Sequence, residues 1–272
     1  MIPAFFLEVT VGGTQWTGYE ERILLDNKEL STKELMGLLP GRSRSSVTSR
    51  LKYLGIAKPV GHRKYNINMS FFSEPDPINS YFAGFIAADG CISPKKHLVS
   101  FGIKAGDGYI LEELVKHSKF EGQVSYTKQG YPRADLFIWG VKKWHEDLKR
   151  HFNITPQKSL TLQPPSVKDD SCIRAFIRGY IDGDGGVYPL RGSNEWVIKV
   201  VGTHSVIEWI YNYFGNLVPP TSNKFAKPWP YGNVWGYSPS GKRSVKILKK
   251  LLEVDTPYLK RKWNPIIEYL GL

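Results

Sequence analysis

Apolar residues recur at helical spacing in three short segments near the start of the chain. Residues 16–25, 31–39 and 43–54 each carry apolar positions three or four apart, and the first two begin with capping signals. A Pro40-Gly41 turn separates the second segment from the third, which is basic. Two helices, a tight turn and a basic helix are typical of a helix-turn-helix, so we predict a small three-helix domain.

Beyond residue 76, one order of predicted elements occurs twice. Each copy runs helix, strands, helix, strands, helix, with a strand at 98–104 in the first copy and at 196–201 in the second. The last helix of each copy is predicted near 142–151 and 244–252. The repeat predicts an α+β fold of two pseudo-symmetric αββαββα half-domains with antiparallel sheets.

The predicted strands alternate in polarity. In residues 131–138, Tyr131, Arg133 and Asp135 alternate with apolar residues, so one face packs under helices and the other stays polar. The equivalent stretch of the second copy carries Lys224, Lys227, Trp229, Tyr231 and Asn233. Sheet faces of this kind can contact base edges in a major groove.

The helices that open the two copies match each other position by position. Phe82–Gly90 falls on Ile177–Gly185 at an offset of 95 residues, with small residues spaced along one helical face. Each segment ends in an acid followed by glycine, although the end of a helix carries partial negative charge. Parallel packing would bring the acids, Asp89 and Asp184, to one place, where they repel unless a cation lies between them. The sequence therefore predicts a metal site at a paired-helix seam.

Charge and composition narrow the class of partner. The 272 residues include 37 basic and 25 acidic ones, a net charge of +12, which favours a polyanion such as nucleic acid. The two cysteines, Cys91 and Cys172, form no zinc array or disulfide framework and fit a reducing compartment. With no signal peptide or long apolar run, we expect a soluble intracellular protein without a membrane partner.

The third predicted helix lies in a basic stretch. Residues 41–65 contain seven Lys or Arg and no acid, which fits DNA contact, although a solvated basic face is the usual meaning of such a run. The segment resembles Myb/SANT-like helix-turn-helix modules in its early Trp and its Leu-Leu-Pro-Gly-Arg-Ser run at 38–43. The predicted contacts are Arg42, Arg44, Ser45, Ser46, Arg50 and Lys52. Residues 57–76 are basic and punctuated by proline, which predicts a linker.

The paired segments resemble the motifs of the LAGLIDADG homing endonucleases in their monomeric two-motif form. The resemblance covers residues 77–272 and implies two saddle-shaped sheets that grip a long DNA site, with both strands cut across the minor groove. Together with the three-helix domain and linker predicted from the sequence pattern, it gives domains at 1–72 (helix-turn-helix and linker), 73–166 and 167–272. Asp89 and Asp184 correspond to the metal ligands, assisted by the backbone carbonyls of Ala88 and Gly183.

The resemblance also implies basic groups around the metals. The candidates are Lys158 and Lys262, with Lys104 weaker and Lys199 weaker still; a surface lysine is the alternative for Lys158. Asp182 is acidic at a position where the first copy has Ala87, and we expect it to project away from Asp184 toward solvent or the other half. We expect Arg178, where the family has alanine, to be partly exposed at the helix rim.

The expected function is site-specific, Mg²⁺-dependent cleavage of double-stranded DNA, by a monomer that needs no protein partner. Mn²⁺ or Ca²⁺ can substitute for binding, since hard oxygen ligands suit such ions. A non-cleaving DNA-binding regulator and an RNA maturase on the same fold stay open as alternatives. The expected contacts on the sheets are Lys128, Tyr131, Arg133, Asp135, Arg191, Lys199, Lys224, Lys227, Tyr231 and Asn233.

Overall fold

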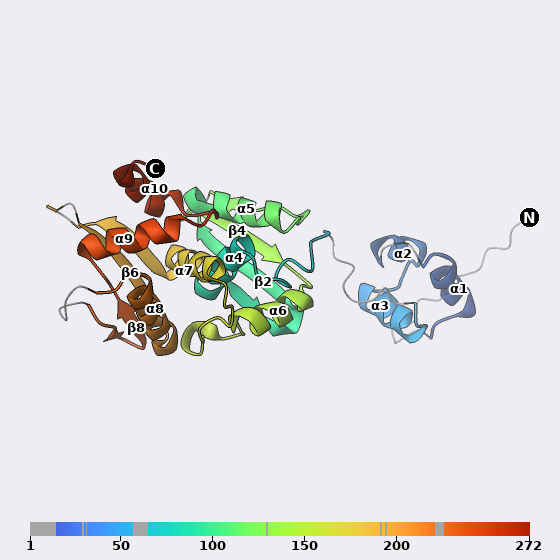
Figure 1. Cartoon of the computed structure of the whole chain (residues 1–272). Coiled ribbons are helices and arrows are strands. Elements are labelled where there is room, and N and C mark those ends of the chain that lie inside the picture. The colour runs from blue at the N-terminus through green and yellow to red at the C-terminus, as the bar shows by residue number, and fades with distance from the viewer. Residues whose placement is uncertain are drawn as a thin grey trace, which may run out of the picture. The chain divides into compact units, whose positions relative to one another are not determined.

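The computed structural model describes residues 15–28, 30, 32–56, 65–128, 130–190, 192–193, 195–220 and 226–272 (Figure 1). The chain divides into two compact units, residues 1–62 and 63–272. Among the described residues, no helix combines the length and apolar character needed to cross a bilayer.

The first unit contains three helices, as the sequence predicts. They are α1 (Gly18–Asp26), α2 (Thr32–Leu38) and α3 (Arg44–Tyr53). Thr17 caps α1 in a reciprocal capping box with Glu20, and the Ser43 side chain accepts from Ser46 N–H at the start of α3. The apolar sides of the helices close over one small core, made of Leu24, Leu35, Leu39, Val47 and Leu51.

The second unit begins with the first predicted half-domain. Its elements are α4 (Pro77–Ala88), β1 (Cys91–Ser93), β2 (Leu98–Lys104), α5 (Tyr109–His117), β3 (Ser125–Thr127), β4 (Arg133–Ile138) and α6 (Lys142–Phe152). The strands form an antiparallel sheet in the order β1-β2-β4-β3. Short 3-10 turns lie at Pro94–Lys96, Ala105–Asp107 and Lys158–Leu160.

The second half-domain repeats this plan. Its elements are α7 (Asp170–Asp184), β5 (Gly185–Pro189), β6 (Trp196–Gly202), α8 (His204–Leu217), β7 (Trp229–Tyr231), β8 (Val234–Tyr237) and α9 (Gly241–Leu252). The sheet order β5-β6-β8-β7 has the same connectivity as the first, so the predicted pair of αββαββα halves is confirmed. One further helix, α10 (Lys260–Leu270), follows the second copy and has no counterpart in the first.

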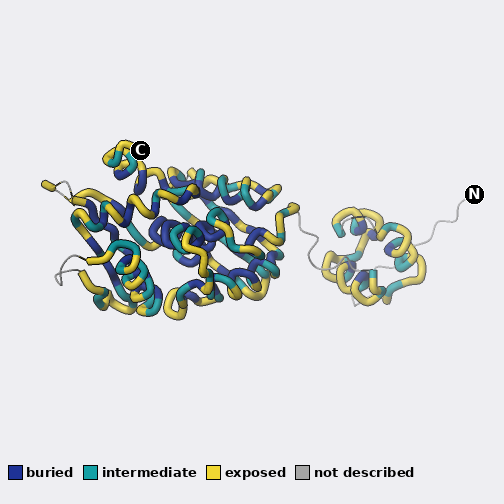
Figure 2. The backbone as a smooth tube through the Cα atoms, viewed as in Figure 1, coloured by how far each residue is buried: buried dark blue, intermediate teal, exposed yellow. Residues whose placement is uncertain are grey.

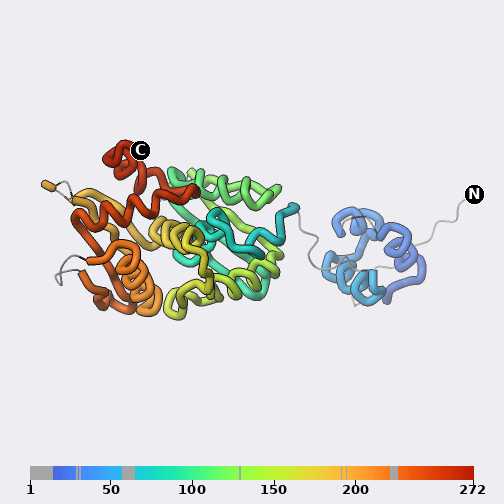
Figure 3. The backbone as a smooth tube through the Cα atoms, in the orientation of Figure 1, coloured from blue at the N-terminus to red at the C-terminus, as the bar shows by residue number. Residues whose placement is uncertain are grey.

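The helices α4 and α7 form the seam between the halves, and Figure 3 shows them together at the middle of the second unit. Glycine permits this close packing. A Cβ atom at Gly84 would lie 2.0 Å from the Phe176 carbonyl oxygen, and one at Gly179 would lie 1.9 Å from that of Tyr81. Any side chain at either glycine would therefore push the backbones apart.

Buried residues gather in the interior of the second unit, as Figure 2 shows, and β2 and β4 alternate between buried and more exposed residues. In β4, Ala134, Leu136 and Ile138 are buried, whereas Arg133 and Phe137 are exposed. The alternation predicted from the sequence is therefore confirmed in this strand. The exposed side chains of β4 lie on the face opposite the buried core.

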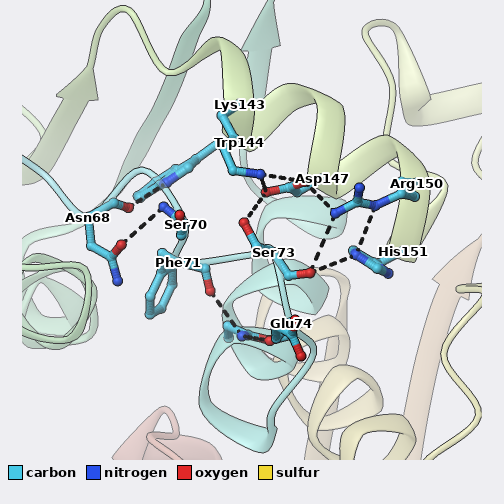
Figure 4. Close-up of polar contacts among 11 residues, drawn as sticks. Asn68, Ser70, Phe71, Ser73, Glu74, Lys143, Trp144, Asp147, Arg150 and His151 are labelled. Atoms are coloured by element: carbon cyan, nitrogen blue, oxygen red, sulfur yellow. Dashed lines mark hydrogen bonds and ion pairs between the residues drawn. The ribbon is translucent and has the colours of Figure 1, made fainter.

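Residues 65–76 belong to the second unit, where the sequence pattern predicts a linker (Figure 4). The Asn68 carbonyl accepts from Trp144 Nε1 at 2.9 Å, and the Ser73 hydroxyl donates to Asp147 at 2.7 Å. Phe71 and Phe72 are buried in the main core. Proline and charge mark this segment as a turn, but its aromatic pair anchors it against α6.

Candidate functional site

The two seam helices end at the same place. The helix α4 finishes at Ala88 with Asp89 as its C-cap, and α7 finishes at Asp184. A Cβ atom at Gly183 would lie 2.2 Å from Ala88 Cβ and 3.3 Å from Asp89 Cγ. The structure therefore brings the ends of both motifs into contact, as the repeat predicts.

The two carboxylates repel each other where they meet. Both aspartates are exposed, although the helix ends partly desolvate them. Partial burial and the charge of Asp89 raise the pKa of Asp184 to about 6. Burial also raises the pKa of Asp89, against the opposing charges of Lys262 and Lys158. Among the described residues, no basic side chain forms an ion pair with either carboxylate within 4 Å, so a cation bound here would relieve the repulsion.

Two buried lysines lie at the ends of the seam helices. Lys158 Nζ donates to the Ala88 carbonyl at 2.9 Å. Lys262 Nζ donates to the carbonyls of Ile181, Asp182 and Gly185 at 2.8, 2.6 and 2.7 Å. Each ammonium group therefore satisfies carbonyls at the negative end of a helix.

Burial lowers the pKa of both lysines, and that of Lys262 falls to about 8. The charges of Asp184 and Asp89 oppose the shift at Lys158, which places this ammonium group within electrostatic reach of both carboxylates. A cavity of about 250 Å³ opens beside Lys158 and Asp184, with Ala88 and Tyr180 also in its wall. The cavity gives a small polar ligand access to the Asp184 carboxylate.

The chemistry of these donors fits a hard divalent cation. Within the described ranges, no three His, Cys, Asp or Glu side chains cluster tightly enough to hold an ion. Two carboxylates at exposed helix ends, with backbone carbonyls and water, are the ligands that Mg²⁺ commonly takes, because it keeps several waters. The residues present therefore fit an oxygen-ligated ion and not a thiolate-bound one.

Asp182 lies away from the pair of exposed carboxylates. It is 1% exposed and accepts from Tyr81 Oη at 2.7 Å, from Leu259 N at 2.8 Å and from Trp263 Nε1 at 2.7 Å. The sequence left solvent and the other half as alternatives for its direction. The Asp182 side chain points to the other half, where it contacts Tyr81 of α4, and it also contacts the start of α10.

The expectation for Arg178 is wrong. Its side chain is 2% exposed, donates to the Val254 carbonyl and lies over the rings of Tyr258 and Trp263. The segment that leads into α10 covers this part of α7. Because the first copy has no equivalent helix, the repeat gave no sign of this cover.

The remaining candidates on the sheets are mostly accessible. Lys104 is exposed at the end of β2, and Lys199 is half-buried with Nζ 5.1 Å from the centre of the Tyr231 ring. Asp135 is half-buried and pairs with Arg133 at 3.1 Å, which offsets the acid on this face. The other exposed candidates are Lys128, Tyr131, Lys227, Tyr231 and Asn233. Arg191 and Lys224 lie outside the described residues.

Sequence reasoning missed an aromatic pair on the same face of the first sheet. Phe137 and Trp139 are 50% and 46% exposed, and their rings stack with centroids 6.4 Å apart. Lys96 Nζ lies 5.1 Å from the centre of the Trp139 ring. The alternation of residues 131–138 points Phe137 outward, so the pattern could have identified it.

Two of the predicted contacts in the three-helix unit hold that unit together. Arg42 pairs with Glu20 at 2.7 Å and lies 4.4 Å from the centre of the Trp16 ring, and Arg50 pairs with Glu21. Arg42, in the turn before α3, and Arg50, within α3, each pair with an acid of α1 inside the same unit. Arg44, Ser45 and Lys52 are exposed along α3, whereas Ser46 is half-buried.

The fold is thus a pair of αββαββα halves joined along a helix seam, with two carboxylates at its end. No protein-family model matches the chain, and no curated protein matches it. Similar solved structures include LAGLIDADG meganuclease I-AabMI bound to uncleaved DNA, with 11% identity over 72% of this chain and 89% of that one, at a TM-score of 0.48. Another is meganuclease I-SmaMI bound to uncleaveable DNA, with 13% identity over 72% and 88% and a TM-score of 0.46.

Full-length DUF199/WhiA from "Thermatoga maritima" is also similar, with 14% identity over 75% of this chain and 64% of that one, at a TM-score of 0.45. The two meganucleases and DUF199/WhiA thus have comparable sequence identity to this chain and comparable TM-scores. A fold can host several functions, so the site itself has to carry the functional conclusion.

Proposed function

We propose that this protein is a divalent-metal-dependent endonuclease that cleaves double-stranded DNA. The observation that carries the proposal is the meeting of Asp89 and Asp184 at the end of the seam, with a lysine buried beside each helix end. A binding protein gains nothing from two mutually repelling carboxylates held close to phosphate. A nuclease uses such a pair to hold a cation.

Each group at the site has a role in phosphodiester hydrolysis. Asp89 and Asp184 would hold Mg²⁺, with the Gly183 carbonyl as a further oxygen donor. The Ala88 carbonyl is the other expected donor, and it already accepts from Lys158 Nζ at 2.9 Å. An ion held there would supply a water of lowered pKa and offset charge on the phosphate. Lys158 and Lys262 keep positive charge beside the carboxylates while they fix the helix ends, and the exposed Lys104 can reach the DNA backbone.

The exposed faces of the two sheets are the proposed DNA surface. Both carry basic and aromatic side chains, and strands of this kind fit the major groove. Because the halves differ in sequence throughout, we expect a monomer and an asymmetric target. The three-helix unit adds contacts through the exposed face of α3, chiefly to phosphates through Arg44 and Lys52.

Neutral substitution of each carboxylate tests the proposal. A target is first selected by cleavage from a randomised duplex library in Mg²⁺. Asp89→Asn and Asp184→Asn should each reduce double-strand cleavage by about 10²-fold or more, the scale seen when one preorganised group that stabilises the transition state is removed. The exposed Asp255 lies outside the site, so Asp255→Asn serves as the matched control.

Calcium binding to the same variants provides a measurement that does not depend on turnover. Titration calorimetry should show weaker Ca²⁺ binding by Asp89→Asn and Asp184→Asn than by Asp255→Asn. Wild-type cleavage by either site variant would contradict the proposal. Tight duplex binding without cleavage by the wild-type protein would favour a regulator, and preferential RNA binding would favour a maturase.

A further inference from the structure

The start of α10 contacts both halves of the second unit. On the side of the second half, the Leu259 backbone N–H and the Trp263 indole donate to Asp182 of α7. On the side of the first half, the Lys260 backbone N–H donates to the Tyr109 hydroxyl, and Arg261 pairs with Asp107 at 2.9 Å. Residues 259–263 therefore bridge the halves, and in Figure 1 α10 lies beside α5.

Lys262 lies in the middle of this bridge. Its neighbours in sequence make the contacts described above, while its own ammonium group points to the end of α7 and is 6% exposed. A lysine side chain has several rotatable bonds, and fixing it costs conformational entropy. The surrounding contacts fix the backbone on both sides of it, which reduces the freedom left to the side chain.

We propose that Asp182 is a positioning residue that holds residues 259–263 in place and thereby sets Lys262 at the end of the second motif helix. The inference rests on the proposed function for the catalytic use of Lys262, but not for the position of its side chain. The buried Asp182 carboxylate accepts three hydrogen bonds. Two come from Leu259 and Trp263 at the start of α10, and the third comes from Tyr81 of α4. The Asp182 carboxylate thus fixes the seam and the lysine together.

Only the second half has this arrangement. The first copy has Ala87 where the second has Asp182, and no helix equivalent to α10. Lys158 instead begins the short 3-10 turn Lys158–Leu160 and reaches the end of α4 from there. The two lysines occupy similar positions through different supports, so a change at Asp182 should affect one half of the site.

Substitution of Asp182 by Asn keeps the volume but turns an acceptor-only group into one with an N–H₂ group. At least one of the three donors then loses its partner, and an unpaired buried polar group is costly. Tyr81→Phe is the milder variant, because it removes one donor and leaves the other two. If residues 259–263 shift, Lys262 becomes exposed while Lys158 does not.

Lysine acetylation followed by mass spectrometry follows this exposure in the full-length protein without DNA. Tyr81→Phe is the deciding variant, because it leaves in place the Asp182 charge, which opposes the lowering of the Lys262 pKa by burial. In Asp182→Asn, we expect Lys262 to react at least about threefold faster than in the wild type, with Lys158 as the unchanged internal reference. Tyr81→Phe should give a smaller increase at Lys262. Equal reactivity of Lys262 in wild type and Asp182→Asn, or a parallel rise at Lys158, would overturn the inference.

Plasmid cleavage adds the functional readout. Under the proposed function each carboxylate and the lysine beside it serve the cut in one strand, so Asp182→Asn should accumulate nicked plasmid, with a lower kcat and a similar KM. Lys262→Met should do the same, and the double variant should be no slower than Lys262→Met alone, because both changes act through one group. Additive losses would contradict the coupling.

The two sets of measurements separate the inference from the proposed function. Selective exposure of Lys262 in a protein whose wild type cuts no duplex would uphold the positioning role and reject the nuclease. Equal slowing of both strands in Asp182→Asn would show a general loss of structure and reject the positioning role.

Discussion

Adding one methyl group at the seam should destabilise the second unit. In Gly179→Ala, the new Cβ would lie 1.9 Å from the Tyr81 carbonyl oxygen and 2.9 Å from Phe85 N, both backbone atoms. A tolerable contact requires α4 and α7 to separate by about 1 Å, which weakens dispersion contacts along the whole seam. No side chain can move aside to relieve the clash.

The magnitude follows from two opposing effects. Overpacking costs up to about 3 kcal/mol, and alanine recovers about 1 kcal/mol through its better helix propensity. The net loss is therefore about 2 kcal/mol. For a unit of this size that corresponds to a fall in Tm of about 4–8 °C.

Thermal unfolding followed by circular dichroism measures the effect, and the chain offers a matched control. Gly215 lies in α8, and a Cβ atom there would meet nothing within 4 Å. Gly215→Ala should therefore raise the Tm by about 2 °C through the lower entropy of the unfolded chain. If Gly179→Ala unfolds at or above the wild-type temperature, the close backbone contact is not what holds the halves together.

Two further predictions concern pH and the boundary between the units. With the pKa of Asp184 raised to about 6, protons compete with the metal below that pH, so Ca²⁺ affinity should rise between pH 5 and 7, and Asp184→Asn should flatten this dependence in calorimetry. In the absence of metal, the free energy of unfolding should change with pH in the opposite direction to Ca²⁺ affinity. Between pH 3.8 and about 6 the folded state binds more protons at Asp184 than the unfolded state, so the contribution of Asp184 to the free energy of unfolding falls as pH rises through that window. Removing residues 1–62 should leave the Tm of the second unit unchanged but weaken DNA binding and reduce its salt dependence, whereas removing residues 1–72 should also lower the Tm because Phe71 and Phe72 leave the core. Unchanged affinity and salt slope after the first deletion would show that the three-helix unit has another partner.

The repeat in the sequence was sufficient to predict the plan of the second unit. Its small residues, Gly84 with Ala88 and Gly179 with Gly183, fall on one face of each motif helix, and a helix places such residues along one line. Two helices with small residues along a line pack closely there, so the contact between the ends at Asp89 and Asp184 could be predicted without coordinates. Alternation in residues 131–138 likewise determined which side chains of β4 are exposed, because the side chains of a strand alternate between its faces.

Other features depend on segments that are distant in the sequence. Arg178 and Asp182 are buried because residues 254–263 return to α7, and the repeat contains no trace of that extra helix. Arg42 and Arg50 form ion pairs with Glu20 and Glu21, which lie more than twenty residues earlier in the chain. The sequence shows that a side chain is charged. It does not show whether that side chain forms an ion pair within the protein or stays available for DNA.

The sequence by itself determined the two halves, the seam and the pair of acids at its end, because these follow from periodicities within single elements. Only the tertiary structure decided which charges are exposed and how Lys262 is held. The physical reason is that burial and pairing are properties of the surroundings: the same lysine is a solvated surface charge or a fixed cap on a helix end, depending on which helix packs against it.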